Sequence, residues 1–275
     1  MPAAITPQRA ALLLVPLLAA LSGCPRVKVD LGKDGAPTSA DDLLRRIGTA
    51  ESQIFAVKGD GRLVVDSPQG KGAVTIFAAV SHPAFIHLEQ LDFFGRPQTV
   101  FVTDGTSFGL YDAQQGKYFR GPATAPNLSR FLPVVMPPTE LASVMLGRAP
   151  RIQSQSREMR FDDALQVFVL MLKRGDVTQY LHVQPPSYRV VKSWAEGITA
   201  YELAFSDIAA PNPGVTLPKV AALEVAVAKT KLELTWKDIT VNEAPDLTLF
   251  DLEPPEGVAV VEVDASGNPR QPPPQ

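Results

Sequence analysis

The segment from residue 73 to residue 112, AVTIFAAVSHPAFIHLEQLDFFGRPQTVFVTDGTSFGLYD, constrains the fold of this chain more than any other stretch. It contains four short apolar runs, which are separated by Ser81-His82-Pro83, Gly95-Arg96-Pro97 and Asp104-Gly105. Within the runs, β-branched and aromatic residues alternate with a period of two, as in strands, and the residues between the runs are typical turn formers. The pattern predicts an antiparallel meander of four strands.

The same alternation extends to both sides of the meander. In the stretch 231–241, Leu232, Leu234 and Trp236 fall on one side and mostly charged residues on the other, which predicts a sheet with one solvated face. The stretch 165–173 is apolar on both faces, and we therefore expect a central strand there. Strands are predicted at 54–66 (with a bulge at 59–61), 118–120, 165–173, 177–183, 188–194, 200–206, 220–228 and 231–241.

Short helices interrupt this series of strands. Ser39 is typical of an N-cap, and the apolar residues after it predict a helix that ends near Gly48. A second helix is predicted from Thr139 to Leu146, ended by Gly147. The fold class is therefore mainly β (α+β): a large antiparallel sheet that curls into an incomplete barrel, with short helices as its cover, because a long twisted sheet must close, split or be covered.

The first 23 residues have the features of an export signal. Arg9 precedes an apolar run at residues 10–21, which is too short to span a bilayer. The run ends in Leu21-Ser22-Gly23-Cys24, which resembles a bacterial lipobox. The resemblance implies cleavage before Cys24, a diacylglycerol on its thiol, and a lipid-anchored protein of the cell envelope. The alternative is an ordinary signal peptide that happens to contain a cysteine.

Three further features limit the compartment and the partners. Cys24 is the only cysteine, so no disulfide can form within the chain. Pro25, where an Asp would favour the inner membrane, favours the periplasmic face of the outer membrane. The formal net charge of −3, without a Lys/Arg block, excludes an electrostatic case for nucleic acid. We expect a signal peptide at 1–23, a tether at 24–39, one domain at 40–262 and a disordered Pro-rich tail at 263–275.

The meander and the C-terminal part resemble the LolA/LolB superfamily of lipoprotein carriers and receptors. The positions that match the carrier pattern are Pro83, Phe85, Asp104, Gly105 and Tyr111. The turn Asp92-Phe93-Phe94-Gly95 is similar to that of LolB, the lipid-anchored receptor. The resemblance implies an incomplete β-barrel with a helical lid over an apolar cavity for acyl chains. It departs at His82 and His87, where the carriers tend to have an arginine that holds the lid closed.

If this resemblance holds, the Pro-rich loop at 121–138 and the helix after it form the lid, with Leu141, Val144 and Met145 on the apolar face of that helix. The expected ligands are lipids or the acyl chains of lipoproteins. The alternative for the apolar residues is a filled core, because pockets and cores are made of the same residue types. The cavity candidates are Phe77, Phe85, His87, Leu91, Phe101, Phe108, Val167, Val169, Tyr201 and Phe205.

Catalytic patterns are weak by comparison. Gly105-Thr106-Ser107-Phe108-Gly109 matches G-x-S-x-G, but that motif requires a strand, a strained turn and a helix, and the residues here predict a hairpin. The three histidines are too dispersed for a metal site, and no cofactor motif is present. We therefore expect, in this order, a lipid-binding envelope protein, a non-enzymatic envelope scaffold that acts through a protein partner, and an esterase that uses Ser107.

Overall fold

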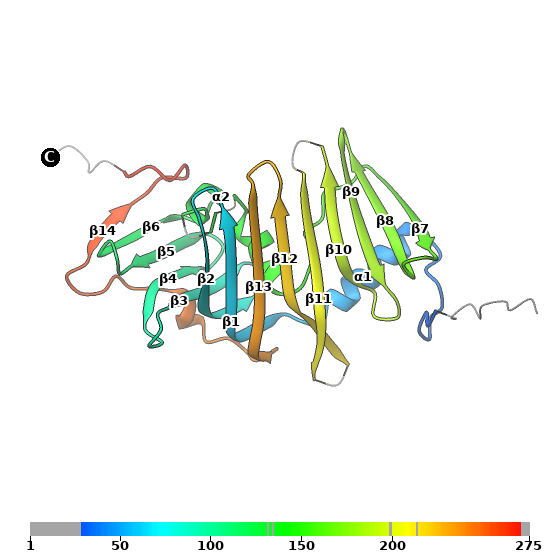
Figure 1. Cartoon of the computed structure of the whole chain (residues 1–275), viewed down its shortest axis with the longest axis horizontal. Coiled ribbons are helices and arrows are strands. Elements are labelled where there is room, and N and C mark those ends of the chain that lie inside the picture. Colours follow the sequence, from blue (N-terminus) through cyan, green and yellow to red (C-terminus); the bar gives the residue numbers. More distant parts are fainter. Residues whose placement is uncertain (1–28, 131, 134, 198–199, 213, 271–275) are drawn as a thin grey trace, which may run out of the picture.

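The structure, a computed structural model of the chain, describes residues 29–270 apart from residues 131, 134, 198–199 and 213 (Figure 1). The expected signal peptide and Cys24, the expected site of lipidation, lie outside the described residues. Within the described part, no helix has both the length and the apolar character needed to cross a bilayer.

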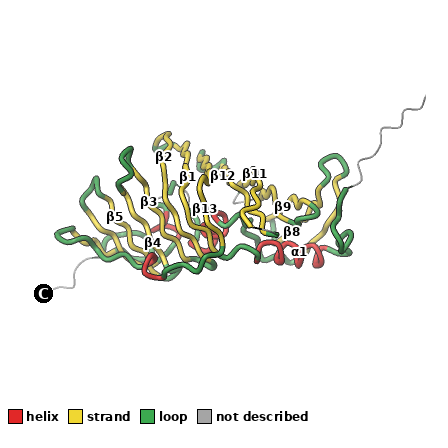
Figure 2. The backbone as a smooth tube through the Cα atoms, turned by 90° about the horizontal axis from the view of Figure 1, so that it is seen from below, coloured by secondary structure: helices red, strands yellow, loops and turns green. Residues whose placement is uncertain are grey.

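One sheet contains all the strands, and its order is β14-β6-β5-β4-β3-β2-β1-β13-β12-β11-β10-β9-β8-β7. Neighbouring strands are antiparallel except β14 and β6, which are parallel. The sheet curls without closing, so that β14 and β7 are its edges (Figure 2). The strands are β1 (Ala56–Ser67), β2 (Gly70–Ser81), β3 (Phe85–Leu91), β4 (Pro97–Thr103), β5 (Ser107–Asp112), β6 (Lys117–Pro122), β7 (Ser156–Asp162), β8 (Val167–Arg174), β9 (Val177–Gln184), β10 (Arg189–Glu196), β11 (Tyr201–Asn212), β12 (Val215–Val225), β13 (Thr230–Val241) and β14 (Ala259–Glu262).

The predicted fold class and the predicted meander are both confirmed. Strands β2 to β5 follow each other in the sheet with antiparallel register, and the predicted bulge in β1 lies between Gly59 and Gly61. Alternate residues of these strands form the main hydrophobic core on one face, for example Ile76, Ala78 and Val80 of β2. We call this covered side of the sheet the inner face and the opposite side the outer face.

Helices cover the inner face. They are α1 (Ala40–Ser52), α2 (Ala125–Leu128) and α3 (Pro138–Met145). The Ser39 side chain caps α1 as predicted, because its Oγ accepts a hydrogen bond from the backbone N–H of Asp42 at 3.1 Å. The helix continues past the predicted end to Ser52, because Leu43, Ile47 and Ala50 share one face and are buried in the core. Tertiary burial thus outweighs the helix-breaking tendency of the glycine in its middle.

Strand β8 is not central, contrary to the sequence prediction. It lies one strand from the edge, between β9 and β7. Its outer residues Val167 and Val169 are nevertheless buried, although no helix covers them. Val169 lies opposite His182 of β9, whose ring contacts Trp194 of β10 at a centroid distance of 4.9 Å. Large side chains from the neighbouring strands therefore bury the second apolar face of β8, the feature from which a central strand was predicted.

After β13, the chain crosses the outer face before it reaches β14. This crossing segment, residues 243–258, is called the strap; it contains the short 3₁₀ helix η1 (Leu247–Phe250). The imidazole Nδ1 of His87 donates to the carbonyl oxygen of Leu249 at 2.6 Å, and the ring centroids of Phe250 and Phe85 are 5.3 Å apart. The strap thus covers the part of the outer face on which Phe85 and His87 lie.

The structure also differs from the predicted tether and tail. Thr124 and Asn127 of the α2 region donate hydrogen bonds to the carbonyl oxygens of Ala265 and Asp264, at 2.7 and 3.0 Å. Residues 263–270 are therefore ordered against α2, and only 271–275 of the expected tail lie outside the described residues. At the other end, Arg46 donates to the carbonyl oxygen of Gly35 at 2.7 Å, which fastens the described part of the tether to α1.

Candidate functional site

A small pocket lies between the inner face of the sheet and a roof formed by α3 and the residues before it. Its volume is about 50 Å³, and all of its lining residues are apolar. The period of two along the strands explains this lining, because alternate leucines of β13 and β12 point to the same side. The floor consists of Leu63, Ile76, Leu88, Ala221, Leu223, Leu232 and Leu234, and the roof of Leu132, Met136, Leu141, Val144 and Met145.

The roof is fixed at the C-terminal end of α3. The indole Nε1 of Trp236 donates to the carbonyl oxygen of Met145 at 3.3 Å, and Arg148 donates to the carbonyl oxygen of Ile54. Gly147 has a φ of +70°, and a Cβ at that position would lie 2.6 Å from Pro218, so the turn after α3 is tightly packed against β12. The hydrogen bonds and the packing hold this end of the helix on the sheet.

The residues before α3 are held more weakly. Pro133, Pro137 and Pro138 have no N–H to donate, and neither Val135 nor Met136 donates a backbone hydrogen bond to another described residue. The Val135 side chain is 74% exposed. Among the described residues, the roof therefore makes hydrogen bonds to the sheet at the C-terminal end of α3 and not at Val135 or Met136.

The residues expected from the sequence are only partly brought together. Leu141, Val144 and Met145 all lie in the roof. Phe101, Phe108, Tyr201 and Phe205 point to the inner face but belong to the core beside the pocket and do not line it. The Tyr201 hydroxyl, for example, is bonded to Gln179 and Ser193, and burial raises the pKa of that hydroxyl.

The other cavity candidates lie on the outer face of the sheet, opposite the pocket. The single hollow expected from all ten candidates is wrong, because successive residues of a strand point to opposite faces. Leu88 lines the pocket, so its neighbour His87 faces outward, where its Nε2 is 2.7 Å from Glu89. The six candidates on the outer face are Phe77, Phe85, His87, Leu91, Val167 and Val169.

The floor leucines were not among the candidates. Leu232 and Leu234 carried a usable signal, namely the clean alternation of apolar and charged residues in β13. Leu63 lies in β1, where it pairs with Leu234 of the neighbouring strand β13. This pairing follows from the topology of the sheet and not from the local sequence. The cavity candidates on the inner face, all of them aromatic, therefore lie in the core beside the pocket and not in its lining.

The pocket as it stands is too small for a long ligand. An apolar cavity that binds benzene measures about 150 Å³, three times the volume found here. An acyl chain can enter only if α3 moves away from the floor. Because the lining offers no polar partner, recognition there would depend on burial alone, at about 0.8 kcal/mol for each CH₂ group.

The structure does not place Ser107 in the geometry that an esterase of the G-x-S-x-G type requires. Residues 104–106 connect β4 to β5, Ser107 begins β5, and its hydroxyl lies 3.3 Å from the carboxylate of Asp104. No helix follows the serine, whereas the G-x-S-x-G elbow requires one. His182, the histidine downstream, packs against Trp194 on the far strand β10. Among the described residues, no group of three or more His, Cys, Asp or Glu could hold a metal ion.

The curled, open sheet with helices over its inner face (Figure 2) agrees with the incomplete barrel and helical cover that the sequence predicts. No protein-family model matches the sequence, and no curated protein does either. A candidate outer membrane lipoprotein-sorting protein domain from Vibrio parahaemolyticus has a similar structure, with a TM-score of 0.51 and 11% identity over 77% of this chain and 97% of that chain. A DUF1329 family protein from Desulfovibrio piger has a TM-score of 0.56 and 9% identity over 81% and 98% of the two chains.

A LolA superfamily protein from Nitrosomonas europaea is a third similar structure, with a TM-score of 0.49 and 12% identity over 78% of this chain and 98% of that chain. The identities are low, so the likeness to the first two structures concerns the fold. At that level the comparison agrees with the open, curled sheet that the resemblance to the LolA/LolB superfamily implied: the chain has a fold similar to that of the lipoprotein-sorting domain and of the DUF1329 protein.

Proposed function

We propose that this protein binds lipids or acyl chains on the inner face of its open barrel, beneath α3, and that it does so as a lipid-anchored protein of the cell envelope. The observation that carries the proposal is the wholly apolar pocket, whose roof is hydrogen-bonded to the sheet at the C-terminal end of α3. Movement of α3 would enlarge the pocket and expose the leucines of its floor. The protein would act by binding rather than by catalysis, in the trafficking of lipids or in the localisation of lipoproteins.

The proposed location follows from Cys24. Its acylation would hold the protein on the periplasmic face of the outer membrane, and two or more acyl chains make such an anchor stable. The fold shared with a candidate outer membrane lipoprotein-sorting domain supports an envelope location. Membrane lipid is then both the surface on which the protein lies and the source of its ligand.

The ligand proposal predicts that Ala221→Phe abolishes most acyl binding. Ala221 lies in the floor, and a phenyl ring there would occupy more than the 50 Å³ available. The chain with Cys24→Ala is titrated with a fluorescent fatty acid, and Ala221→Phe should weaken its binding by about tenfold or more. Ala222→Phe is the matched control, because the neighbouring residue faces outward on the same strand, and its affinity should stay within about twofold.

Equal affinities for the two variants would contradict the proposal, provided that both melt cooperatively. A chain that takes up no probe would instead favour the alternative of a non-enzymatic scaffold with a filled core and a protein partner. The small volume of the pocket is the observation that favours this alternative.

Direct membrane contact is proposed for the hairpin between β3 and β4. At its tip Phe93 is 97% and Phe94 78% exposed, the two rings lie 5.5 Å apart, and Asp92 accepts hydrogen bonds from the backbone N–H groups of Phe94 and Arg96 at 2.8 and 2.9 Å. The turn is thus rigid and presents two adjacent aromatic side chains to solvent. Apolar residues placed in this way are typical of interaction sites.

We predict that the double variant Phe93→Ser/Phe94→Ser binds vesicles at least about tenfold more weakly, because each phenylalanine contributes about 1.5–3 kcal/mol when buried. The measurement is cosedimentation of the Cys24→Ala chain with vesicles of phosphatidylethanolamine and phosphatidylglycerol. Val227→Ser removes an 81% exposed side chain between β12 and β13 and serves as the control. An equal loss in the control would refute a specific role for the β3–β4 hairpin.

A further inference from the structure

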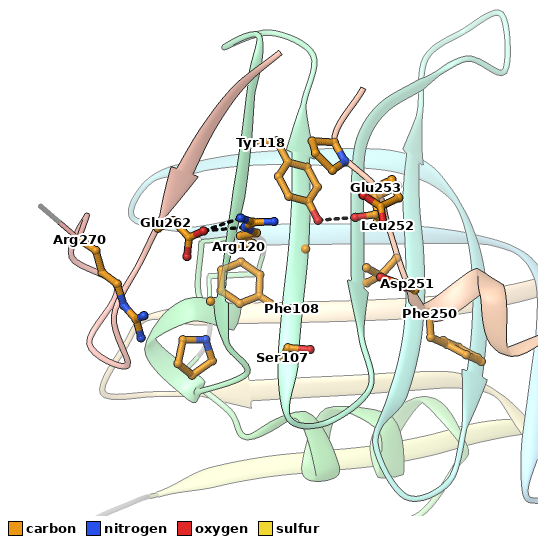
Figure 3. A pocket seen from close by; sticks show the side chains of 15 residues that line it. Ser107, Phe108, Tyr118, Arg120, Phe250, Asp251, Leu252, Glu253, Glu262 and Arg270 are labelled. Atoms are coloured by element: carbon orange, nitrogen blue, oxygen red, sulfur yellow. Dashed lines mark hydrogen bonds and ion pairs between the residues drawn. The ribbon is translucent and has the colours of Figure 1, made fainter. Parts of the chain in front are cut away.

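A second and larger pocket lies on the outer face, between the strap and strands β5 and β6 (Figure 3). Its volume is about 370 Å³. This falls within the range of about 300–1,000 Å³ that is usual for small-molecule sites. It shares no lining residue with the pocket beneath α3 and lies on the other side of the sheet. The inference drawn from it therefore does not depend on the proposed lipid function.

The pocket exists because Tyr118 holds the strap at a distance from the sheet. The Tyr118 hydroxyl donates to the carbonyl oxygen of Leu252, and its ring lies above β5. Gly109 makes room for that ring, since a Cβ at position 109 would collide with the Tyr118 hydroxyl. Ser107 of the same strand also lines the pocket. The floor is thus a strand surface with little side-chain volume, spanned by the strap.

The two walls of the pocket carry opposite charge. On the side of β6 and β14 are Arg120, Glu262 and Arg270; Arg120 donates to Glu262 through Nε and Nη2 at 2.8 and 2.6 Å, so the unpaired charge of this wall is that of Arg270. On the side of the strap are Asp251 and Glu253 (Figure 3). In the described part of the chain, no hydrogen bond or ion pair engages the side chains of Arg270, Asp251 or Glu253.

The charges of both walls act on the hydroxyl of Tyr118. Burial raises the pKa of the Tyr118 hydroxyl; the positive charge of Arg120 opposes this rise, and the negative charges of Asp251 and Glu253 add to it. Tyr118 therefore lies within the field of both walls. A simple anion in the pocket would face the carboxylates of the strap, and a simple cation would face the guanidinium groups. Only a ligand with both charges is attracted by both walls at once.

We propose that this outer pocket binds a small zwitterion, with its phosphate or carboxylate group at Arg270 and its ammonium group at Asp251 and Glu253. Guanidinium groups suit the anionic end, because they donate two parallel hydrogen bonds to a phosphate or carboxylate. The ligand chemistry has two possible sources in an envelope: a free zwitterion, or the headgroup of a phospholipid such as phosphatidylethanolamine.

The test is isothermal titration of the Cys24→Ala chain with phosphoethanolamine, with inorganic phosphate, and with ethanolamine. We expect phosphoethanolamine to bind at least about tenfold more tightly than either of its halves, because each half engages only one wall. Binding of inorganic phosphate with equal affinity would reduce the pocket to an anion site and overturn the proposal. Equal binding of ethanolamine, or no binding of phosphoethanolamine, would overturn it as well.

Variants assign the binding to the pocket. Arg270→Gln and the double variant Asp251→Asn/Glu253→Gln should each weaken phosphoethanolamine by about tenfold, since each removes the charge of one wall. Arg174→Gln, at the exposed end of β8, is the control and should change nothing. These side chains are exposed, so the variants should fold; a wild-type affinity in both wall variants would contradict the assignment.

The two sources are separated with a short-chain phosphatidylethanolamine that is soluble as a monomer. The titration is made in the Ala221→Phe chain, in which the pocket beneath α3 is blocked. If the lipid binds at least as tightly as phosphoethanolamine, and Arg270→Gln weakens both, the headgroup is the ligand. If the acyl chains weaken binding by about tenfold, the free zwitterion is the ligand.

Discussion

A chain with Gly59→Ala should lose about 3 kcal/mol or more of its free energy of unfolding. We expect no other added methyl group to destabilise the protein as much. Gly59 lies in the β1 bulge, where a Cβ would collide with the carbonyl oxygen of Asp238 in β13 and lie 2.8 Å from the Cα of Ile239. Both obstacles are backbone atoms of the neighbouring strand, so no change of side-chain rotamer relieves the collision. The strands must separate at the centre of the sheet.

Gly72→Ala is the matched control for this prediction. Gly72 lies in β2, the other neighbour of β1, and nothing lies within 4 Å of a Cβ built there. Its free energy of unfolding should be unchanged or higher by about 0.5 kcal/mol, because alanine reduces the entropy of the unfolded chain. Urea denaturation of both variants gives the comparison. A Gly59→Ala chain as stable as Gly72→Ala would mean that β1 and β13 do not pair as described.

Trp236→Ala should cost about 3–5 kcal/mol of unfolding free energy, the usual range for a large aromatic side chain removed from a core. Trp236 is 2% exposed and lies where β13 meets the end of α3. The substitution would remove the indole from the core and leave the carbonyl oxygen of Met145 without its donor. It should therefore both destabilise the sheet and release the fixed end of the roof.

Two further variants separate these effects. Trp236→Phe keeps most of the packing but loses the hydrogen bond, so we expect a cost of about 1 kcal/mol and a faster association of the acyl probe. Trp194→Ala removes an indole from the outer face, which should lower stability without changing the association rate. Stopped-flow fluorescence measures the rate. If Trp236→Phe and wild type take up the probe equally fast, the bond to Met145 does not hold the roof.

The local pattern of the sequence was sufficient for most strands. The meander, the β1 bulge and the wet face of β13 follow from alternation and from turn residues, which act over a few positions and need no tertiary information. The Ser39 cap of α1 follows in the same way. Strand β7 was not predicted, since its residues are mostly polar, and its place at the edge of the sheet explains that composition.

Fewer residues of the candidate site than of the fold could be predicted from the sequence. The three roof residues of α3 could be named because one apolar face of a short helix must lie against something. The floor could not be named, because it combines five strands from both ends of the chain, β1, β2, β3, β12 and β13. The aromatic residues chosen instead were large and apolar, and those properties do not distinguish a core from a pocket.

The sequence alone therefore determined which residues form strands, which residues of one strand share a face, and that the N-terminal segment predicts export and lipidation. The tertiary structure decided which of the two faces the helices cover, where β8 lies, and how the strap divides the outer face. The physical reason is that alternation specifies faces only relative to one another within a strand. Which face becomes the inside depends on pairing between distant strands and on the path of the segments that cross them.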